Sequence, residues 1–165
     1  MEIRDLYDGN KKLTGETIYK GEKVPEGRYY LTVMVFMENS NGELLLQKRS
    51  KEKGSKYGTT GGHPKTGETS LSGMQTEIEE ELGIKIDASK LKLFKTLKTE
   101  DDFVDVYYCK EDIDLDKLVF QEEEVESAKY FNMNEIENLI KENKFLDAHI
   151  EYLEYYKKFK KQCIN

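Results

Sequence analysis

The segment from Tyr29 to Met37 constrains the fold of this chain most, because it combines β-branched and aromatic residues with an uninterrupted apolar run. That composition is typical of a buried β-strand. A turn-forming stretch, Asn39 to Gly42, follows, and Glu43 to Lys48 adds three consecutive leucines, so the region predicts a β-hairpin. Further strands are expected at residues 3–7, 17–19, 91–98, 103–109 and 128–132, and helices at residues 69–82, 133–142 and 147–161. This order predicts an α/β fold that begins with a short N-terminal hairpin.

Length and composition predict one acidic globular domain. The 165 residues suit a single domain over residues 1–165, since a domain has about 150 residues. A net charge of −7 disfavours nucleic acid as a partner, because protein surfaces that bind nucleic acid are usually basic. The longest apolar run, Val33 to Met37, is far shorter than the roughly 18 residues that cross a membrane. Two cysteines without a C-x-x-C pair form no disulfide framework. We therefore expect a cytoplasmic protein with no membrane segment and no secretory signal.

The segment from Ser50 to Gly67 predicts a long functional loop. It carries five glycines and few apolar side chains, and long ordered loops in compact domains are usually functional. Between Lys48 and Lys65 the chain has six basic residues and one acidic residue, Glu52. A basic, glycine-rich loop suits a phosphate group, because cations and backbone amides bind phosphate oxygens. The alternative is that these lysines only keep a mobile loop soluble.

The predicted helix over residues 69–82 carries a cluster of carboxylates beside its apolar face. At 100° per residue, Glu77, Glu80 and Glu81 share an arc of roughly 100°. Like charges at this spacing destabilise a helix by about 0.2 to 0.5 kcal/mol per pair. A divalent cation such as Mg²⁺ or Mn²⁺ would compensate, since hard cations bind carboxylate oxygens. A solvated acidic face is the alternative that the charges alone leave open.

These residues together resemble the Nudix box, G-x5-E-x7-R-E-U-x-E-E-x-G-U, where U is an aliphatic residue. The likeness runs from Gly62 through Glu68 to residues 76–84, and every fixed position matches except Thr76, which stands where the family has arginine. The resemblance implies the Nudix fold, an α/β/α sandwich around a mixed β-sheet. It also implies metal-dependent hydrolysis of a nucleoside diphosphate linked to another moiety, with a small-molecule diphosphate as substrate and Mg²⁺ or Mn²⁺ as cofactor. The residues that the resemblance assigns to catalysis and to the metal are Glu77, Glu80 and Glu81, with Gly62 as a further metal ligand through its carbonyl and Glu77 as candidate general base.

A narrower resemblance raises two alternative functions. Residues 5–8, 45–50 and 61–64 look like the Nudix subgroup related to type 1 isopentenyl diphosphate isomerase. That isomerase carries its catalytic cysteine where this chain has Gly61, and it binds metal through further histidines, whereas no histidine precedes His63 here. The departure at Thr76 motivates the other alternative, a non-catalytic module that binds a diphosphate, because the family arginine is understood to orient the acidic residues.

Basic residues near the box are candidates for binding the substrate. These candidates are Arg28, Lys48, Arg49 and His63. An arginine can bind phosphate oxygens in a bidentate manner, but either arginine could instead pair with a surface acid, and His63 could simply bond the backbone.

Three further groups of residues are assigned possible roles. A fourth carboxylate ligand could come from Glu100, Glu123 or Glu124, of which Glu124 best matches the acidic segment often seen beyond the box. Lys65 could replace the cation lost at Thr76. The aromatic residues of the last predicted helix are expected in the core, with a homodimer contact as the alternative.

Overall fold

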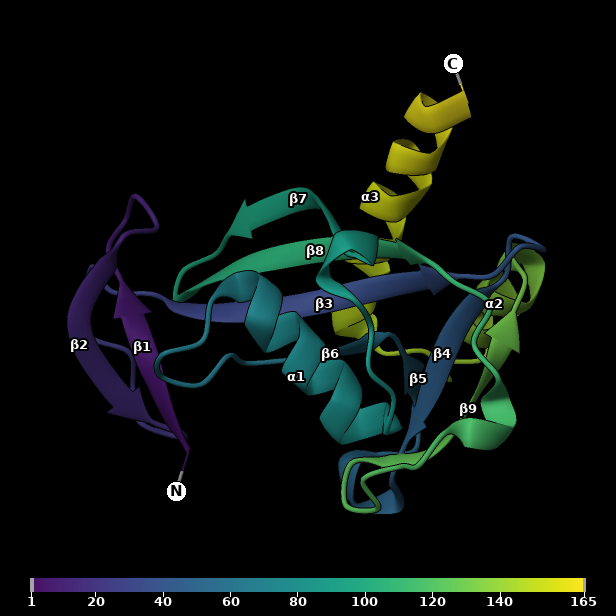
Figure 1. Ribbon diagram of the computed structural model, residues 1–165, viewed down its shortest axis with the longest axis horizontal. Coiled ribbons are helices and arrows are strands. Elements are labelled where there is room, and N and C mark those ends of the chain that lie inside the picture. The colour runs from purple at the N-terminus through teal and green to yellow at the C-terminus, as the bar shows by residue number, and fades with distance from the viewer. Residues whose placement is uncertain (1, 165) are drawn as a thin grey trace.

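The computed structural model describes residues 2–164, and its longer strands and its three α-helices follow one another in the order that the sequence predicts (Figure 1). The strands are β1 (Ile3–Tyr7), β2 (Leu13–Tyr19), β3 (Tyr30–Glu38), β4 (Leu44–Arg49), β5 (Tyr57–Gly58), β6 (Thr60–Gly62), β7 (Lys92–Lys98), β8 (Asp102–Lys110) and β9 (Val125–Phe131). The helices are α1 (Ser70–Leu82), α2 (Met133–Lys141) and α3 (Asp147–Ile164), with 3₁₀ turns η1 (Lys51–Lys53), η2 (Ala88–Lys90) and η3 (Leu115–Lys117).

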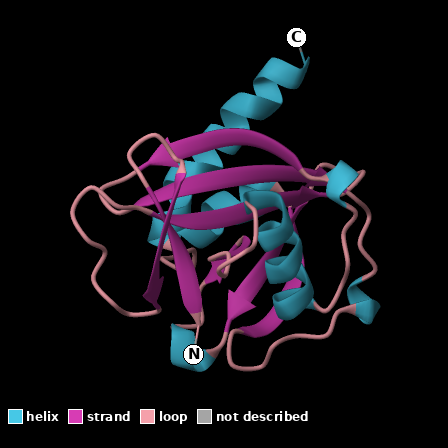
Figure 2. Cartoon of the chain, turned by 60° about the vertical axis from the view of Figure 1, so that its left-hand side comes forward, coloured by secondary structure: helices cyan, strands magenta, loops and turns pink. Residues whose placement is uncertain are grey.

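Strand β3 organises a mixed sheet. It pairs in parallel with β8 along its whole length and antiparallel with β6, where Met34 faces Gly61. Strand β7 extends the sheet beyond β8, and β4 connects it to β5 and β9. Helix α1 covers one face of the sheet, while α2 and α3 lie against the other (Figure 2). This arrangement confirms the predicted α/β/α sandwich around a mixed sheet.

The alternation of side chains along β3 divides the core into two layers. Val33 and Val35 pack toward α1, whereas Met34 and Phe36 pack toward α2 and α3. Because successive strand residues point to opposite faces, a strand buried on both sides must be apolar throughout. The uninterrupted apolar run of β3 is therefore the expected sequence of a central strand.

The N-terminal hairpin is attached to the sheet through a buried carboxylate. Asp105 of β8 has no exposed surface, and its oxygens accept hydrogen bonds from Lys11 Nζ at 2.7 Å, Ser70 Oγ at 2.6 Å and Thr96 Oγ1 at 2.6 Å. Lys11 belongs to the turn between β1 and β2, and Ser70 is the first residue of α1. Asp105 therefore joins the hairpin, the start of α1 and the sheet, and a buried charge of this kind requires all of its partners.

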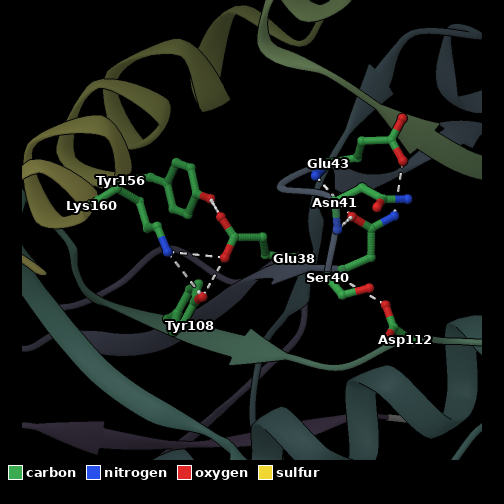
Figure 3. Close-up of polar contacts among 9 residues, drawn as sticks. Glu38, Ser40, Asn41, Glu43, Tyr108, Asp112, Tyr156 and Lys160 are labelled. Atoms are coloured by element: carbon green, nitrogen blue, oxygen red, sulfur yellow. Dashed lines mark hydrogen bonds and ion pairs between the residues drawn. The ribbon is translucent and has the colours of Figure 1, made fainter. Parts of the chain in front are cut away.

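A second buried carboxylate anchors the last helix. Glu38, at the end of β3, accepts hydrogen bonds from Tyr156 at 2.7 Å and Lys160 at 2.9 Å on α3, and from Tyr108 on β8 (Figure 3). Beyond Lys160 the last residues of α3 extend away from the sheet (Figure 1). The predicted core role of the aromatic residues is confirmed at Tyr156, which is buried, whereas Tyr152, Tyr155 and Phe159 are partly buried. The homodimer contact stays a prediction.

The structure corrects the sequence-based elements in three places. The segment 50–67 is not one loop, because it contains η1 and the short strands β5 and β6. These strands are not predicted from the sequence, because glycine is unfavourable within strands. Strand β2 begins at Leu13 rather than residue 17, and β9 begins at Val125 rather than residue 128. Within residues 2–164, no helix is both long and apolar enough to cross a membrane.

Replacing Glu38 with alanine is expected to lower the free energy of unfolding by about 2 to 4 kcal/mol, because two tyrosines and a lysine lose their shared partner. Burial raises the pKa of Glu38, but its three hydrogen bonds together lower the pKa by more than burial raises it. The net pKa therefore lies below the ordinary value of 4.5. The contribution is therefore complete above about pH 4.5 and is lost as the pH falls through the lower folded value. Urea denaturation of both proteins at several pH values measures this.

Glu154→Ala is the matched control, since Glu154 lies exposed on α3 and pairs with Lys157. It should change stability by less than about 0.5 kcal/mol. A Glu38→Ala variant as stable as this control at neutral pH would contradict the anchoring role.

Candidate active site

Helix α1 brings the predicted carboxylates to a cleft because its other face is fixed in the core. Thr69 caps the helix through a capping box with Ser72, and Gly83 ends it in a left-handed conformation at φ 71°. Met74, Ile78 and Leu82 are fully buried against the sheet. Rotation of the helix is thereby prevented, so Glu77, Glu80 and Glu81 all line the same cleft.

The cleft has a volume of about 470 Å³ and is bounded by distant parts of the chain. Its walls come from the N-terminal hairpin, β3, the segment from β4 to β6, α1, the segment before β9, and the start of α3. The charged lining residues are Glu2, Arg4, Lys20, Arg49, Lys53, Glu77, Glu80, Glu81 and Glu124. Cations and carboxylates thus face the same space, as the binding of a metal-bridged phosphate requires.

The Glu77 carboxylate lies directly against the backbone of Gly62. A methyl group built on Gly62 would lie 2.3 Å from Glu77 Oε2, so only glycine permits this approach. Burial and the charges of Glu81 and Glu80 raise the pKa of Glu77 to about 8. Within residues 2–164 every fully buried side-chain oxygen or nitrogen has a hydrogen-bond partner, and Glu77 accepts no such bond. Its oxygens therefore reach the cleft, beside Gly62 and in a site that disfavours their negative charge.

Glu81 is the most buried of the three carboxylates, with 7% of the residue exposed. Gln47 Nε2 of β4 donates to Glu81 Oε2 at 3.2 Å, and Thr60 Oγ1 orients Gln47 by donating to its Oε1 at 2.9 Å. Burial raises the pKa of Glu81 to about 7, against the lowering effects of the Gln47 hydrogen bond and of Arg49. The strand β4 therefore holds this carboxylate in a defined orientation.

Lys65 provides a cation beside one carboxylate of the cluster. Its Nζ lies 2.9 Å from Glu80 Oε1, and its backbone amide donates to Glu68 Oε1 at 2.7 Å. Thr76 Oγ1 donates to the other oxygen of Glu68 at 2.6 Å. Lys65 therefore connects two of the four acidic residues of the box, Glu68 and Glu80, while the uncharged Thr76 contacts only Glu68.

The side chains at the cluster offer donors that suit a hard divalent cation. Glu77, Glu80 and Glu81 offer carboxylate oxygens, and burial, with neighbouring carboxylates, raises the pKa of Glu77 and of Glu81, so a cation would stabilise their charged forms. As the side chains stand, no three His, Cys, Asp or Glu residues among residues 2–164 are grouped closely enough to hold a metal ion. Glu80 is paired with Lys65, so binding requires Glu80 to exchange this partner. The chemistry fits Mg²⁺ or Mn²⁺, while the grouping requires side-chain movement.

The cleft includes some of the predicted substrate and metal residues and not others. Arg49, His63 and Glu124 line it. His63 Nδ1 lies 3.2 Å from Thr32 Oγ1, and burial together with the charge of Arg4 lowers the pKa of His63. The residues placed outside the cleft are Arg28, which pairs with Glu16, Lys48, which pairs with Glu126 at 3.0 Å, Glu100 and Glu123. The geometry therefore gives Arg28, Lys48, Glu100 and Glu123 no support as site residues.

Several residues that sequence reasoning missed also line the cleft. Gln47 lies in the predicted leucine-rich strand, and a polar side chain within such a strand could have indicated a site residue. His149 of α3 and Arg4 and Lys20 of the hairpin reach the cleft from segments far from the box. No local pattern places these three residues beside α1.

The isomerase alternative fails at Gly61. A methyl group built there would lie 2.6 Å from the backbone oxygen of Val33 and 3.1 Å from Cβ of Met34. A cysteine would therefore require β6 to move away from β3. The chain lacks the thiol and also the space for it.

Comparison with known proteins agrees with this geometry. A NUDIX domain matches residues 28–153. An uncharacterized Nudix hydrolase of Listeria monocytogenes is 36% identical over 150 residues, which are 88% of this chain and 89% of that protein. An isopentenyl-diphosphate Delta-isomerase of Pectobacterium atrosepticum is 34% identical over 84 residues, which are 48% of this chain and 46% of that protein. The chain belongs to the Nudix family, as an enzyme of the Nudix hydrolase type.

Two solved structures share the fold at low sequence identity. A protein of Deinococcus radiodurans superposes with a TM-score of 0.73 at 21% identity, covering 92% of this chain and 96% of that chain. The NUDIX domain of Shewanella oneidensis NrtR, solved in complex with ADP ribose, gives a TM-score of 0.63 at 14% identity, covering 79% and 87%. The predicted Nudix fold is therefore confirmed.

Glu77→Gln is expected to stabilise the metal-free protein at about pH 8 and to have little effect at about pH 5. Because the folded state raises the pKa of Glu77 from 4.5 to about 8, ionisation destabilises the folded protein progressively across that interval. Thermal unfolding in a chelator, at several pH values, measures the difference between the two proteins. Glu79→Gln is the control, because Glu79 lies on the exposed side of α1. Equal behaviour of the two variants would contradict the crowding of charge at Glu77.

Proposed function

We propose that this protein is a Mg²⁺- or Mn²⁺-dependent hydrolase that cleaves the diphosphate bond of a nucleoside diphosphate linked to another moiety. The observation that carries the proposal is the cluster of Glu77, Glu80 and Glu81 on the cleft side of α1, two of them with raised pKa values. The family membership supports the reaction class. The ADP ribose bound by the NrtR domain supports a small diphosphate compound as ligand.

The residues of the cleft have separate roles in this proposal. When bound, Mg²⁺ or Mn²⁺ would neutralise charge on the diphosphate oxygens. Arg49 binds phosphate oxygens, and Gln47 keeps the Glu81 carboxylate oriented. Glu77 accepts a proton from the attacking water, whose oxygen forms the new bond to phosphorus while the bridging P–O bond breaks.

A non-catalytic module that binds a diphosphate is the second candidate. The observation that favours it is Thr76, which supplies no charge to the acidic cluster. The pairing of Lys65 with Glu80 weakens this candidate, because a cation is present at the cluster after all.

The setting of the protein is part of the same proposal. Cys109 and Cys163 are both free thiols, which suits the reducing cytoplasm. We propose that the chain acts there as a single Nudix domain.

The first test is a turnover screen with Mg²⁺ or Mn²⁺ against ADP ribose, nucleotide sugars, dinucleotides, nucleoside triphosphates and prenyl diphosphates, with products identified by mass spectrometry. We expect hydrolysis of at least one nucleoside diphosphate compound. The double variant Glu80→Gln/Glu81→Gln should lower the rate by about 100-fold or more, because it removes two metal-binding charges. Binding without turnover by the wild-type protein would overturn the hydrolase in favour of the binding module.

A second test separates Lys65 from Thr76. Lys65→Met should lower kcat by about tenfold, because Glu80 loses its cation, and Thr76→Arg should restore most of the rate when added to Lys65→Met. Lys85→Met is the control, since Lys85 is exposed and pairs with Glu79, away from the cleft. If Thr76→Arg alone raises turnover greatly, Lys65 is not the replacement for the family arginine.

A further inference from the structure

The start of α3 is fixed at one end of the cleft by backbone hydrogen bonds. Tyr57 of β5 donates its amide to the carbonyl of Lys144 at 2.8 Å, and Leu146 donates to the carbonyl of Tyr57 at 2.8 Å. Strand β5 pairs with β4, so that Gly58 lies opposite Gln47. This end of the cleft is lined by Gly58, Thr59, Leu146 and His149, and we call it the α3 end.

The imidazole of His149 has a defined orientation at the α3 end. The backbone amide of Thr59 donates to His149 Nδ1 at 3.2 Å. A methyl group built on Gly58 would lie 2.8 Å from Nδ1 and 3.1 Å from Cε1, so the ring packs against a backbone that has no room for a side chain. Because Nδ1 accepts a hydrogen bond, the ring proton of neutral His149 is on Nε2.

The Nε2 atom of His149 is free to bind a ligand. Nδ1 is the only ring atom of His149 with a hydrogen-bond partner among residues 2–164. In the same part of the chain, no fully buried side-chain nitrogen or oxygen lacks a partner. Nε2 is therefore accessible, in a residue that lines the cleft.

The two basic side chains near the α3 end differ in charge, because Arg49 is a cation and His149 is neutral. Burial, reinforced by the nearby charge of Arg49, lowers the pKa of His149 to about 4, so the ring is neutral at physiological pH. The same Arg49 lowers the pKa of Glu81, which places its charge within reach of both residues. A permanent cation suits phosphate oxygens, whereas a neutral N–H suits an uncharged acceptor such as a sugar hydroxyl or a base carbonyl.

We infer that His149 is a specificity-determining residue, whose Nε2–H donates a hydrogen bond to the uncharged group attached to the diphosphate while Arg49 binds the phosphate. This inference rests on the proposed function, because it assumes that a diphosphate occupies the cleft. It assigns the α3 end to a nucleoside or sugar rather than to a phosphate.

Imidazole ¹⁵N NMR tests the inference without requiring turnover. The probe is ADP ribose with a methylene group in place of the bridging diphosphate oxygen, which cannot be hydrolysed there, and its control is methylenediphosphonate, both with Mg²⁺. His149→Gln identifies the resonance by its loss. We expect the ADP ribose analogue to shift the Nε2 resonance and methylenediphosphonate to leave it nearly unchanged. An equal shift with methylenediphosphonate, or none with the analogue, overturns the inference.

Kinetics with the best substrate of the turnover screen gives an independent readout. His149→Leu should raise KM by about tenfold with kcat nearly unchanged, because one ground-state hydrogen bond is lost. His149→Gln, which retains an N–H donor, should recover most of this loss. Glu151→Gln on the exposed side of α3 is the matched control, and circular dichroism checks that each variant folds.

The outcomes separate the two proposals. Hydrolysis by the wild-type protein with an unchanged KM in His149→Leu overturns the role of His149 and leaves the hydrolase intact. A shifted Nε2 resonance in a protein that hydrolyses none of the screened compounds contradicts the proposed function and supports the α3 end as a binding subsite. A KM that rises equally in His149→Leu and His149→Gln overturns the hydrogen bond.

Discussion

The burial of one face of α1 determines where the chemistry of this protein can occur. Met74, Ile78 and Leu82 are fixed in the core, and their burial stabilises the fold by about 1.5 to 3 kcal/mol for each side chain. The carboxylates on the neighbouring arc therefore stay on the cleft side of the helix. Their mutual repulsion and desolvation are therefore built into the folded state, because the packing of the helix outweighs them.

Close backbone approaches complete this arrangement. Gly62 admits the Glu77 carboxylate, and Gly73 of α1 admits Pro64, whose Cγ would lie 2.5 Å from a methyl group at position 73. The loop before α1 therefore contacts the helix at Gly73, through Pro64. The opposite face of the helix packs against the sheet. Side chains at either position would separate the backbone of β6 from the carboxylates.

The periodicity of residues 69–82 was sufficient to predict the helix and the shared orientation of Glu77, Glu80 and Glu81, because both depend on local geometry. The composition of residues 29–37 predicted a strand for the same reason, but not its central place in the sheet. The α3 end was not predictable, because it depends on hydrogen bonds between Tyr57 and residues 144 and 146, which no local pattern encodes. Arg28 and Lys48 are predicted as substrate-binding residues because they are basic, but in the structure each forms an ion pair with a glutamate, outside the cleft.

The position of the N-terminal hairpin has a practical consequence. Glu2, Arg4 and Lys20 line the cleft, and the buried Asp105 holds the turn of this hairpin through Lys11. The last turns of α3, by contrast, extend away from the sheet (Figure 1). An affinity tag or fluorescent fusion joined ahead of Glu2 would therefore lie beside the cleft, whereas the same fusion after α3 would lie clear of it. Purified protein intended for ligand studies should therefore carry its fusion after the last turn of α3, which is remote from the α3 end of the cleft.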